Sequence, residues 1–172
     1  MSTWSARVAA RDERRPEGLI APCLLTASDI VPTGPGWQFE VKHDGFRMCA
    51  RVDDGRVRIW SRNGLSWTKA MSGISTALSE IGRNVVLDGE AVCQLPNGRS
   101  DFHALRGEEG CARAVLWAFD LLMHDGEDLR PLPVEVRRER LAGLIADVRR
   151  PGSRSLSTTR GRVRRSSRQP AA

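Results

Sequence analysis

The chain has 172 residues, of which 40% are hydrophobic and 28% charged. This length is typical of one domain with its own buried core, and the composition excludes a wholly disordered chain. The longest nearly apolar stretch, Ala114 to Met123, is too short to span a bilayer and contains Asp120. The first residues lack the apolar segment of a secretory signal, so we expect a cytoplasmic protein with no membrane partner.

The net charge of +6 belongs to one end of the chain. There are 27 basic and 21 acidic residues in total, and residues 149–172 hold eight arginines and no acid. Residues 1–148 therefore hold 19 basic against 21 acidic residues, a net charge of −2. The high isoelectric point is weak support for nucleic-acid binding by the folded body.

Cysteine and lysine usage narrow the chemistry. The four cysteines, at positions 23, 49, 93 and 111, have no CxxC spacing, and the three histidines are scattered. We predict reduced, mostly buried cysteines and no zinc site. Only Lys42 and Lys69 are lysines among the basic residues. Because lysine can act as an amine nucleophile and arginine cannot, a lysine inside a motif is of special interest.

The first half of the chain predicts strands joined by tight turns. Residues 1–18 read as a flexible arm, and 19–36 as an irregular lead-in rich in Pro and Gly. Alternation predicts a strand over 37–42, with Trp37, Phe39 and Val41 on one face and Glu40 and Lys42 on the other. Further strands are expected over 46–52 and 57–61, separated by turns at 44–45 and 54–55, and 63–64 closes the unit.

The second half predicts two helices around further strands. Apolar spacing favours a helix over 66–81, ended by Gly82, and another over 133–148 that opens with Pro133 and buries Leu141, Leu144, Ile145 and Val148. Strands are expected over 85–92, interrupted at 88–89, and over 114–122, with turns at 96–98 and 125–126. Residues 151–172 contain little to bury and are predicted to be disordered.

Four short motifs occur in order along this pattern. They are Lys42-His43-Asp44-Gly45-Phe46-Arg47, Ser61-Arg62-Asn63-Gly64, Val86-Leu87-Asp88-Gly89-Glu90 and Phe119-Asp120-Leu121-Leu122. The set resembles the adenylation domain of ATP-dependent DNA ligases, in the covalent nucleotidyltransferase superfamily. The lead-in and residues 101–105, Asp-Phe-His-Ala-Leu, are most similar to the bacterial ligases of non-homologous end joining. The resemblance covers residues 19–148 and implies an α+β fold of antiparallel sheets with flanking helices.

The resemblance implies a lysine nucleophile and nucleotide contacts. Lys42 would attack the α-phosphate of ATP, with Mg²⁺ or Mn²⁺, and the AMP would then pass to the 5′-phosphate of nicked or broken double-stranded DNA. End-joining proteins are implied as further partners. The implied roles are adenine contact for Glu40, ribose contact for Arg47, ribose or phosphate contact for Arg62, ribose and metal contact for Glu90, and stacking on adenine for Phe119.

Each of these roles has a structural alternative. Arg62 fits an ordinary arginine at a strand end, Glu90 a solvated carboxylate, and Phe119 a core aromatic. The histidines receive no role. Within the superfamily, RNA-directed nucleotidyltransferases, that is RNA ligases and RNA capping enzymes, are alternatives. Asp44 argues against the usual RNA-ligase motif, and the Ser-Arg-Asn-Gly string and the lead-in argue against capping enzymes.

The sequence departs from the family after the second helix. Family members carry a Glu-Gly motif, a Lys-x-Lys motif and an OB-fold domain there, and none of these follows residue 148 in this sequence. Because such groups neutralise the transferring phosphate, we expect impaired activity. A non-catalytic nucleotide- or DNA-binding remnant and a poorly folded product are the alternatives.

The predicted organisation is an arm over 1–18, a partial adenylation domain over 19–150 and a basic tail over 151–172. The tail composition suggests a shifted reading frame in a GC-rich gene. The rival hypothesis is a basic arm that binds phosphate backbones.

Overall fold

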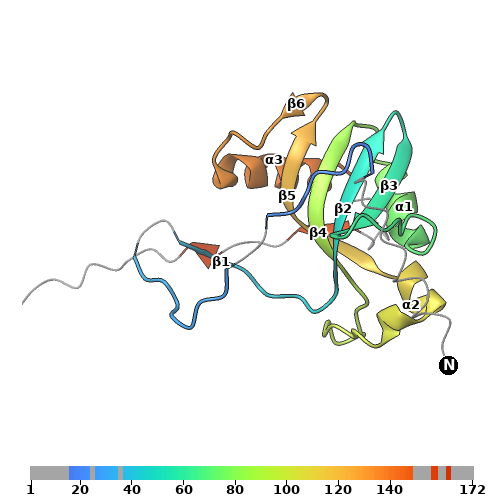
Figure 1. Cartoon of the computed structure of the whole chain (residues 1–172), viewed down its shortest axis with the longest axis horizontal. Coiled ribbons are helices and arrows are strands. Elements are labelled where there is room, and N and C mark those ends of the chain that lie inside the picture. Colours follow the sequence, from blue (N-terminus) through green and yellow to red (C-terminus); the bar gives the residue numbers. More distant parts are fainter. Residues whose placement is uncertain (1–15, 24–25, 35–36, 149–155, 159–161, 164–172) are drawn as a thin grey trace, which may run out of the picture.

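A computed structural model describes residues 16–23, 26–34, 37–148, 156–158 and 162–163 (Figure 1). A six-stranded sheet has the order β3-β2-β4-β5-β6, with β7 beside β5. Its strands are β2 (Phe46–Asp53), β3 (Arg56–Ser61), β4 (Val85–Val92), β5 (Val115–His124), β6 (Glu127–Asp128) and β7 (Leu156–Thr158). A separate two-stranded sheet pairs β1 (Gln38–Phe39) with β8 (Arg162–Val163).

The helices accompany the sheet as the α+β prediction expects. They are α1 (Ser72–Ser79), α2 (Glu108–Ala112) and α3 (Val134–Val148), together with a 3-10 turn over Ala104–Arg106. The strand pairs are antiparallel except for β5 with β7, which is parallel. The predicted fold class is therefore confirmed, with one parallel pair that the sequence pattern did not indicate.

Two tight turns connect neighbouring strands. Asp54 and Gly55 join β2 to β3 with φ values of 48° and 75°, and Asp125 and Gly126 join β5 to β6 with φ values of 47° and 87°. Two successive positive φ angles match the twist of the flanking strands, and Asp-Gly tolerates them well. Both turns were predicted from the Asp-Gly pairs.

The core lies between one face of the sheet and the helices. Helix α3 packs against β5, and α1 packs against β3. The largest fully buried side chains include Met48, Ile59, Leu87 and Leu121 from the sheet, and Ile74, Leu78 and Leu141 from the helices. Burial of such side chains from water is the main stabilising term for a domain of this size.

The opposite face of the sheet is covered in part by the lead-in segment. Cys49, Val86 and Leu122 form a small buried cluster there, and Leu19 and Ile20 pack against it. In Figure 1 this segment, drawn in dark blue, crosses in front of the strands. Because the lead-in covers only this small cluster, the part of the face beyond it can carry a site.

The two helices differ in how well the apolar spacing predicted them. Helix α1 begins at Ser72, later than the predicted residue 66, because Ser66 is bridged to Trp60 and Thr68 to Met71 form turns. Gly82 follows with φ of 63°, as its role as a stop signal requires. Helix α3 matches its predicted range, and Leu141, Leu144 and Ile145 are buried as expected. The side chain of Val148 lies outside the described residues.

Strand β4 corrects one expectation. The sequence predicted an interruption at Asp88 and Gly89, but β4 runs unbroken from Val85 to Val92. The irregularity lies instead in its pairing with β5, which shifts register between Val86 and Leu87 and again between Asp88 and Gly89. Such shifts change where side chains point near a site.

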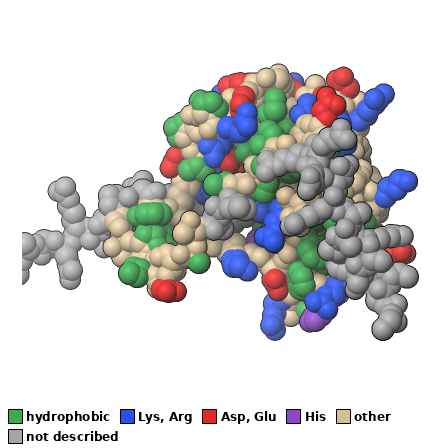
Figure 2. Space-filling view, in the orientation of Figure 1, with side chains coloured by type: hydrophobic (Ala, Val, Ile, Leu, Met, Phe, Trp, Pro, Cys, Tyr) green, Lys and Arg blue, Asp and Glu red, His purple; other side chains and the backbone are tan. Residues whose placement is uncertain are grey.

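The strand predicted over 37–42 is wrong in length. Only Gln38 and Phe39 are paired, and Trp37 and Val41 are 50% and 69% exposed. The alternation predicted one shared apolar face, but two of its three residues are exposed. Ile30 and Val31 are exposed in the neighbouring segment, and Figure 2 shows hydrophobic side chains on the surface of this part of the molecule.

The range predicted to be a disordered tail contains two described pieces. Residues 156–158 pair with β5, and residues 162–163 pair with β1. These five residues are strands, contrary to the expectation, because backbone pairing needs no apolar side chains. The other residues of 151–172, and residues 1–15 of the predicted arm, lie outside the described part.

Cysteine burial and membrane character can both be checked. Cys49, Cys93 and Cys111 are buried thiols and Cys23 is exposed, which agrees with the prediction of mostly buried cysteines. Across the described ranges, no helix combines the length and apolar character needed to cross a membrane.

Gly89 provides a test of the packing between β4 and β5. A Cβ at this position would lie 2.7 Å from the Trp117 carbonyl oxygen, so Gly89→Ala should force the strands apart and destabilise the protein by about 1–3 kcal/mol. Gly143→Ala is the control, since nothing lies within 4 Å in α3 and the helix should gain about 0.5–1 kcal/mol. Urea unfolding of both variants measures the difference, and equal midpoints would contradict the strand geometry.

Candidate functional site

A cavity of about 670 Å³ lies where the lead-in, the segment after β1, the sheet and the first half of α3 meet. Its lining residues are Ile20, Ala21, Cys23, Glu40, Val41, Lys42, His43, Arg47, Asp88, Glu90, Phe119, Asp120, Leu122, Arg130, Val134, Arg137 and Arg138. Nine of these seventeen residues are charged, and they converge beside an apolar wall, a combination found in small-molecule sites.

Five of the six predicted site residues line this cavity. Glu40 and Lys42 come from the segment after β1, Arg47 from β2, Glu90 from β4 and Phe119 from β5. The four motifs are far apart in sequence, and the sheet pairing brings three of them to one place. The exception is Arg62, which is exposed just after β3 and is not part of the cavity lining.

The first charged contact of the cavity joins β2 to β4. Arg47 Nε and Nη2 donate to the two Asp88 carboxylate oxygens at 3.1 and 2.8 Å. The Asp88 side chain is 7% exposed, so this pair neutralises a buried charge. Hydrogen bonding to Asp88 raises the pKa of Arg47 above its ordinary value. The guanidinium carbon also lies 5.1 Å from the centre of the Phe119 ring.

The second charged contact joins β5 to α3. Arg137 Nε and Nη2 each donate to an Asp120 carboxylate oxygen at 2.8 Å, and Arg137 Nη1 donates to the Leu132 carbonyl at 2.6 Å. Hydrogen bonding to Asp120 raises the pKa of Arg137. This bidentate pair fixes the first half of α3 beside the strand that carries Phe119.

The third charged contact joins α3 to the segment of the predicted nucleophile. Arg138 forms an ion pair with Glu40 and also donates to the Gln38 side-chain oxygen. Gln38 Nε2 in turn donates to Glu135 at 3.1 Å. Burial raises the pKa of Glu40, and the charge of Arg138 opposes that rise.

Asp88, Asp120, Arg137 and Arg138 were missed by the sequence reasoning as site residues. Asp88 and Asp120 lie inside the motifs but received no role there. The sequence offered only a weak indication that the consecutive arginines of α3 belong to a site. They follow Pro133 by one helical turn, which places them near the start of the helix. Only the tertiary structure shows that they face the cavity.

Lys42 and Glu90 differ from the other charged groups. Of the cations lining the cavity within the described chain, Lys42 alone makes no ion pair, since Arg130 pairs with Asp128 at 2.6 Å. Glu90 is likewise the lining carboxylate without an ion pair in that part of the chain. Burial raises the pKa of Glu90, while Arg47, the Gly45 amide and Lys42 act in the opposite direction.

His43 also lines the cavity and follows Lys42 in the chain. Its ring stacks on Trp117, with ring centres 4.4 Å apart and planes inclined by 25°. Burial lowers the pKa of His43, which favours the neutral ring. The stack therefore holds the residue next to Lys42 against β5 without adding charge to the cavity.

The donor set does not form a metal site made of protein groups alone. Among the described residues, no cluster of three or more His, Cys, Asp or Glu side chains is placed to hold an ion. Magnesium in nucleotide sites is commonly held by one or two carboxylates together with the phosphates. Glu90, a carboxylate without an ion pair, fits that second arrangement.

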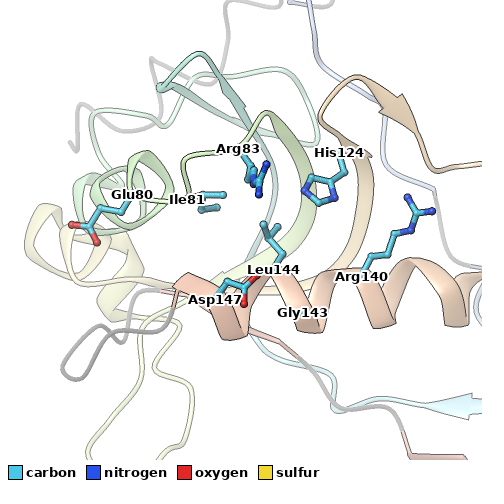
Figure 3. Close-up of a pocket in the computed structure, with 8 residues that line it drawn as sticks. All are labelled: Glu80, Ile81, Arg83, His124, Arg140, Gly143, Leu144 and Asp147. Atoms are coloured by element: carbon cyan, nitrogen blue, oxygen red, sulfur yellow. The ribbon is translucent and has the colours of Figure 1, made fainter.

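A second cavity of about 630 Å³ lies between the end of α1 and the later turns of α3 (Figure 3). His124 and Arg83 line it from the sheet side, and Arg140 from α3. Both arginines have partners, Asp125 at 3.3 Å and Glu127 at 2.6 Å. None of the predicted site residues lines this cavity, so we assign the candidate site to the first one.

Comparison with known proteins identifies the family. The family model described as "ATP dependent DNA ligase domain" matches residues 22–162, which is most of the chain. The chain belongs to the ATP-dependent DNA ligase domain family. The match extends beyond residue 150, where the sequence predicted the domain to end, and it includes β7 and the first residue of β8.

Relatives of this ligase domain are named as end-joining proteins. The chain is 42% identical over 130 residues to the multifunctional non-homologous end joining protein LigD of Pseudomonas aeruginosa, covering 73% of this chain and 15% of that protein. It is 34% identical over 148 residues to the bifunctional LigD of Bacillus subtilis, covering 76% and 24%. The chain thus spans less than a quarter of the length of these relatives.

Solved structures give the same fold. The ligase domain of Mycobacterium tuberculosis LigD superposes with a TM-score of 0.62 at 30% identity, covering 74% of this chain and 42% of that one. A mycobacterial DNA ligase D complexed with ATP and MES gives a TM-score of 0.61 at 30% identity, covering 74% and 41%. The predicted resemblance and the predicted fold are both confirmed.

The Arg47–Asp88 pair predicts an asymmetric effect on stability. Arg47→Met should destabilise the ligase domain by about 3 kcal/mol, because it leaves the Asp88 carboxylate buried without a partner. Arg83→Met is the matched control, since Arg83 and Asp125 are 61% and 45% exposed and such pairs contribute less than about 1 kcal/mol. Thermal unfolding of the two variants is the measurement. A loss no larger for Arg47→Met than for Arg83→Met would contradict the burial of this pair.

Proposed function

We propose that this chain carries out the first step of DNA ligation, the transfer of AMP from ATP to Lys42. The observation that carries the proposal is the pair of charged groups left without ion pairs in the cavity, Lys42 and Glu90. A nucleophilic lysine must present an amine with a free lone pair, and an ion pair with a carboxylate would favour the ammonium form.

The chemical step is a displacement at phosphorus. The uncharged amine of Lys42 attacks the α-phosphate, a P–N bond forms, the bond from the α-phosphorus to the bridging oxygen breaks, and pyrophosphate leaves. The amine loses a proton as it becomes the phosphoramidate nitrogen. Positioning and charge neutralisation supply most of the catalysis in reactions of this kind.

The other lining residues are proposed to hold the nucleotide. Phe119 and the apolar wall fit the base, Glu40 fits a hydrogen-bond donor on that base, and Arg47 fits the ribose. Glu90 would hold Mg²⁺ or Mn²⁺ together with the phosphates, and the ion would supply charge neutralisation there. Arg62 lies away from the cavity, so its proposed contact with ribose or phosphate requires a movement of the segment after β3.

The rate of this step is proposed to be low in this chain. Lys69 is the only lysine besides Lys42, and it is exposed and does not line the cavity. The described arginines of the cavity are all held by carboxylates. Few cations therefore remain to neutralise the transferring phosphate, and losing one such group costs about a hundredfold or more in rate.

The biological setting is proposed from the relatives. Their names refer to non-homologous end joining, so we propose broken or nicked double-stranded DNA as the acceptor of AMP, end-joining proteins as partners, and the cytoplasm as the location. We also propose that the adenylation unit starts near residue 19, because Leu19 and Ile20 pack on the sheet.

Covalent labelling tests the central proposal. The full chain, incubated with ATP and Mg²⁺ or Mn²⁺, should gain one AMP, located on Lys42 by peptide mass spectrometry. Lys42→Arg should abolish the adduct, because a guanidinium cannot act as the nucleophile. Lys69→Arg is the control and should label as the original chain does. A folded protein that never labels, or labels on Lys69, would refute the proposal.

A carboxylate variant tests the role of Glu90. Glu90→Gln keeps the shape but removes the charge, so adduct formation should slow by about a hundredfold and need more divalent ion. Glu80→Gln, at an exposed position outside this cavity, should label normally. An unchanged rate and metal requirement in Glu90→Gln would exclude the metal role.

A further inference from the structure

A row of directly paired residues crosses the face of the sheet that carries the candidate cavity. The ladder pairs Arg47 of β2 with Glu90 of β4, and Glu90 with Trp117 of β5, the three neighbouring strands at the centre of Figure 1. Residues directly opposite each other in a ladder point to the same face of the sheet. Arg47 and Glu90 line the cavity, and Trp117 carries the stacked ring of His43, which also lines it.

The chain directly after Lys42 is fixed to this row at two points. The ring of His43 lies on Trp117, with ring centres 4.4 Å apart. Two residues later, the Gly45 amide donates a hydrogen bond to the Glu90 carboxylate. A Cβ at Gly45 would collide with a backbone carbonyl oxygen of β4, so this approach to the strand requires glycine. The chain therefore crosses from β5 to β4 immediately after the proposed nucleophile.

Lys42 itself has no such anchor. Its side chain is exposed, and it makes no ion pair within the described part of the chain. On its other side, Val41 is 69% exposed, and the next anchored side chain is Glu40. The charge of Lys42 nevertheless acts on the Glu90 carboxyl, where it opposes the rise in pKa that burial causes. The place of the amine relative to Glu90 therefore depends on the residue that follows it, His43.

We propose that His43 is a positioning residue for the AMP transfer, whose stack on Trp117 holds the Lys42 amine beside Glu90, the carboxylate proposed to bind the metal and the phosphates. His43 acts through Lys42 and is not a catalytic residue. The inference rests on the proposed AMP transfer and adds the contact that places its nucleophile.

Both rings take part through their faces and not through their nitrogen atoms. Trp117 Nε1 is buried and has no hydrogen-bond partner among the described residues, although a buried indole N–H usually has one. The contact of His43 is the stack itself, and burial lowers the pKa of its ring, which favours the uncharged form. A stack of two uncharged rings depends on shape and area, so another aromatic side chain should replace either ring.

The kinetics of labelling on the full chain test the proposal. The rate of AMP adduct formation is followed by mass spectrometry over a series of ATP concentrations with Mg²⁺, which separates the maximal rate from half-saturation. His43→Ala should lower the maximal rate by about a hundredfold, because a displaced nucleophile loses its attack geometry. Half-saturation by ATP should change less than about twofold, since no nucleotide contact is removed. His43→Phe keeps an aromatic ring and should stay within about threefold of the original maximal rate.

Variants of the partner ring and a matched control complete the series. Trp117→Leu should reproduce the loss of His43→Ala, and the double variant should lose no more than either single one, because both remove the same contact. Trp117→Phe should label at the original rate. His103→Ala is the control, since His103 is exposed and lines neither cavity. Thermal unfolding of each variant establishes that the rates are those of folded protein.

A second readout needs no nucleotide. Exchange of the amide protons of residues 41–45 with solvent should be faster in His43→Ala than in the original chain and unchanged in His43→Phe, because the stack limits local opening. Exchange that is the same in all three proteins would overturn the proposal.

The labelling outcomes separate this inference from the function on which it rests. An equal loss in His43→Phe and His43→Ala would overturn the proposal, since the ring nitrogens would then be required. A raised half-saturation with an unchanged maximal rate in His43→Ala would also overturn it. Normal labelling of His43→Ala would refute the positioning role and leave the AMP transfer to Lys42 intact. A folded original chain that never labels would refute both.

Discussion

Charge compensation around the cavity is the constraint on which the rest of the site depends. Asp88, Asp120 and Glu40 are brought against the sheet with limited access to water, and an isolated carboxylate in that position would be costly. Each carboxylate is therefore paired with an arginine that lies on another element than the carboxylate itself. These three contacts join β2 to β4, β5 to α3, and α3 to the segment of Lys42, so the same interactions that neutralise the charges also assemble the site.

The sheet and the helices together position the residues of the cavity. Antiparallel pairing of β2, β4 and β5 places Arg47, Glu90 and Phe119 at one cavity, and the tight Asp-Gly turns connect β2 to β3 and β5 to β6 at the edges of this arrangement. The face that packs on α1 and α3 is apolar, whereas the opposite face carries both a small apolar cluster and the charged groups. The division of the sheet into a core face and a site face follows from the period of two along each strand.

Much of this arrangement could be predicted from the sequence. The Asp-Gly pairs determine local backbone angles, so the hairpin turns are encoded within a few residues, and the apolar spacing of α3 indicates its buried side. Residues of the motifs could be assigned because the resemblance spans four ordered strings. Arg137 and Arg138 could not, since their contacts with Asp120 and Glu40 depend on how a helix docks, which no short-range pattern specifies. The same holds for Trp37 and Val41, whose alternation is that of a strand although both side chains are exposed. It also holds for β7, whose pairing with β5 joins residues far apart in the sequence.

The segment that carries Lys42 is attached to the domain far more weakly than the strands around it. Its β1 ladder is two residues long, Val41 is exposed, and its side-chain anchors are the ion pair of Glu40 with Arg138 and the stack of His43 on Trp117. The free energy needed to open this segment is therefore smaller than that of unfolding the core, and its amide protons should exchange with solvent through local openings. A lysine that, as proposed, first receives AMP and then passes it to a second substrate would need this kind of hierarchy, in which the sheet is long-lived and the segment that carries the lysine opens more easily.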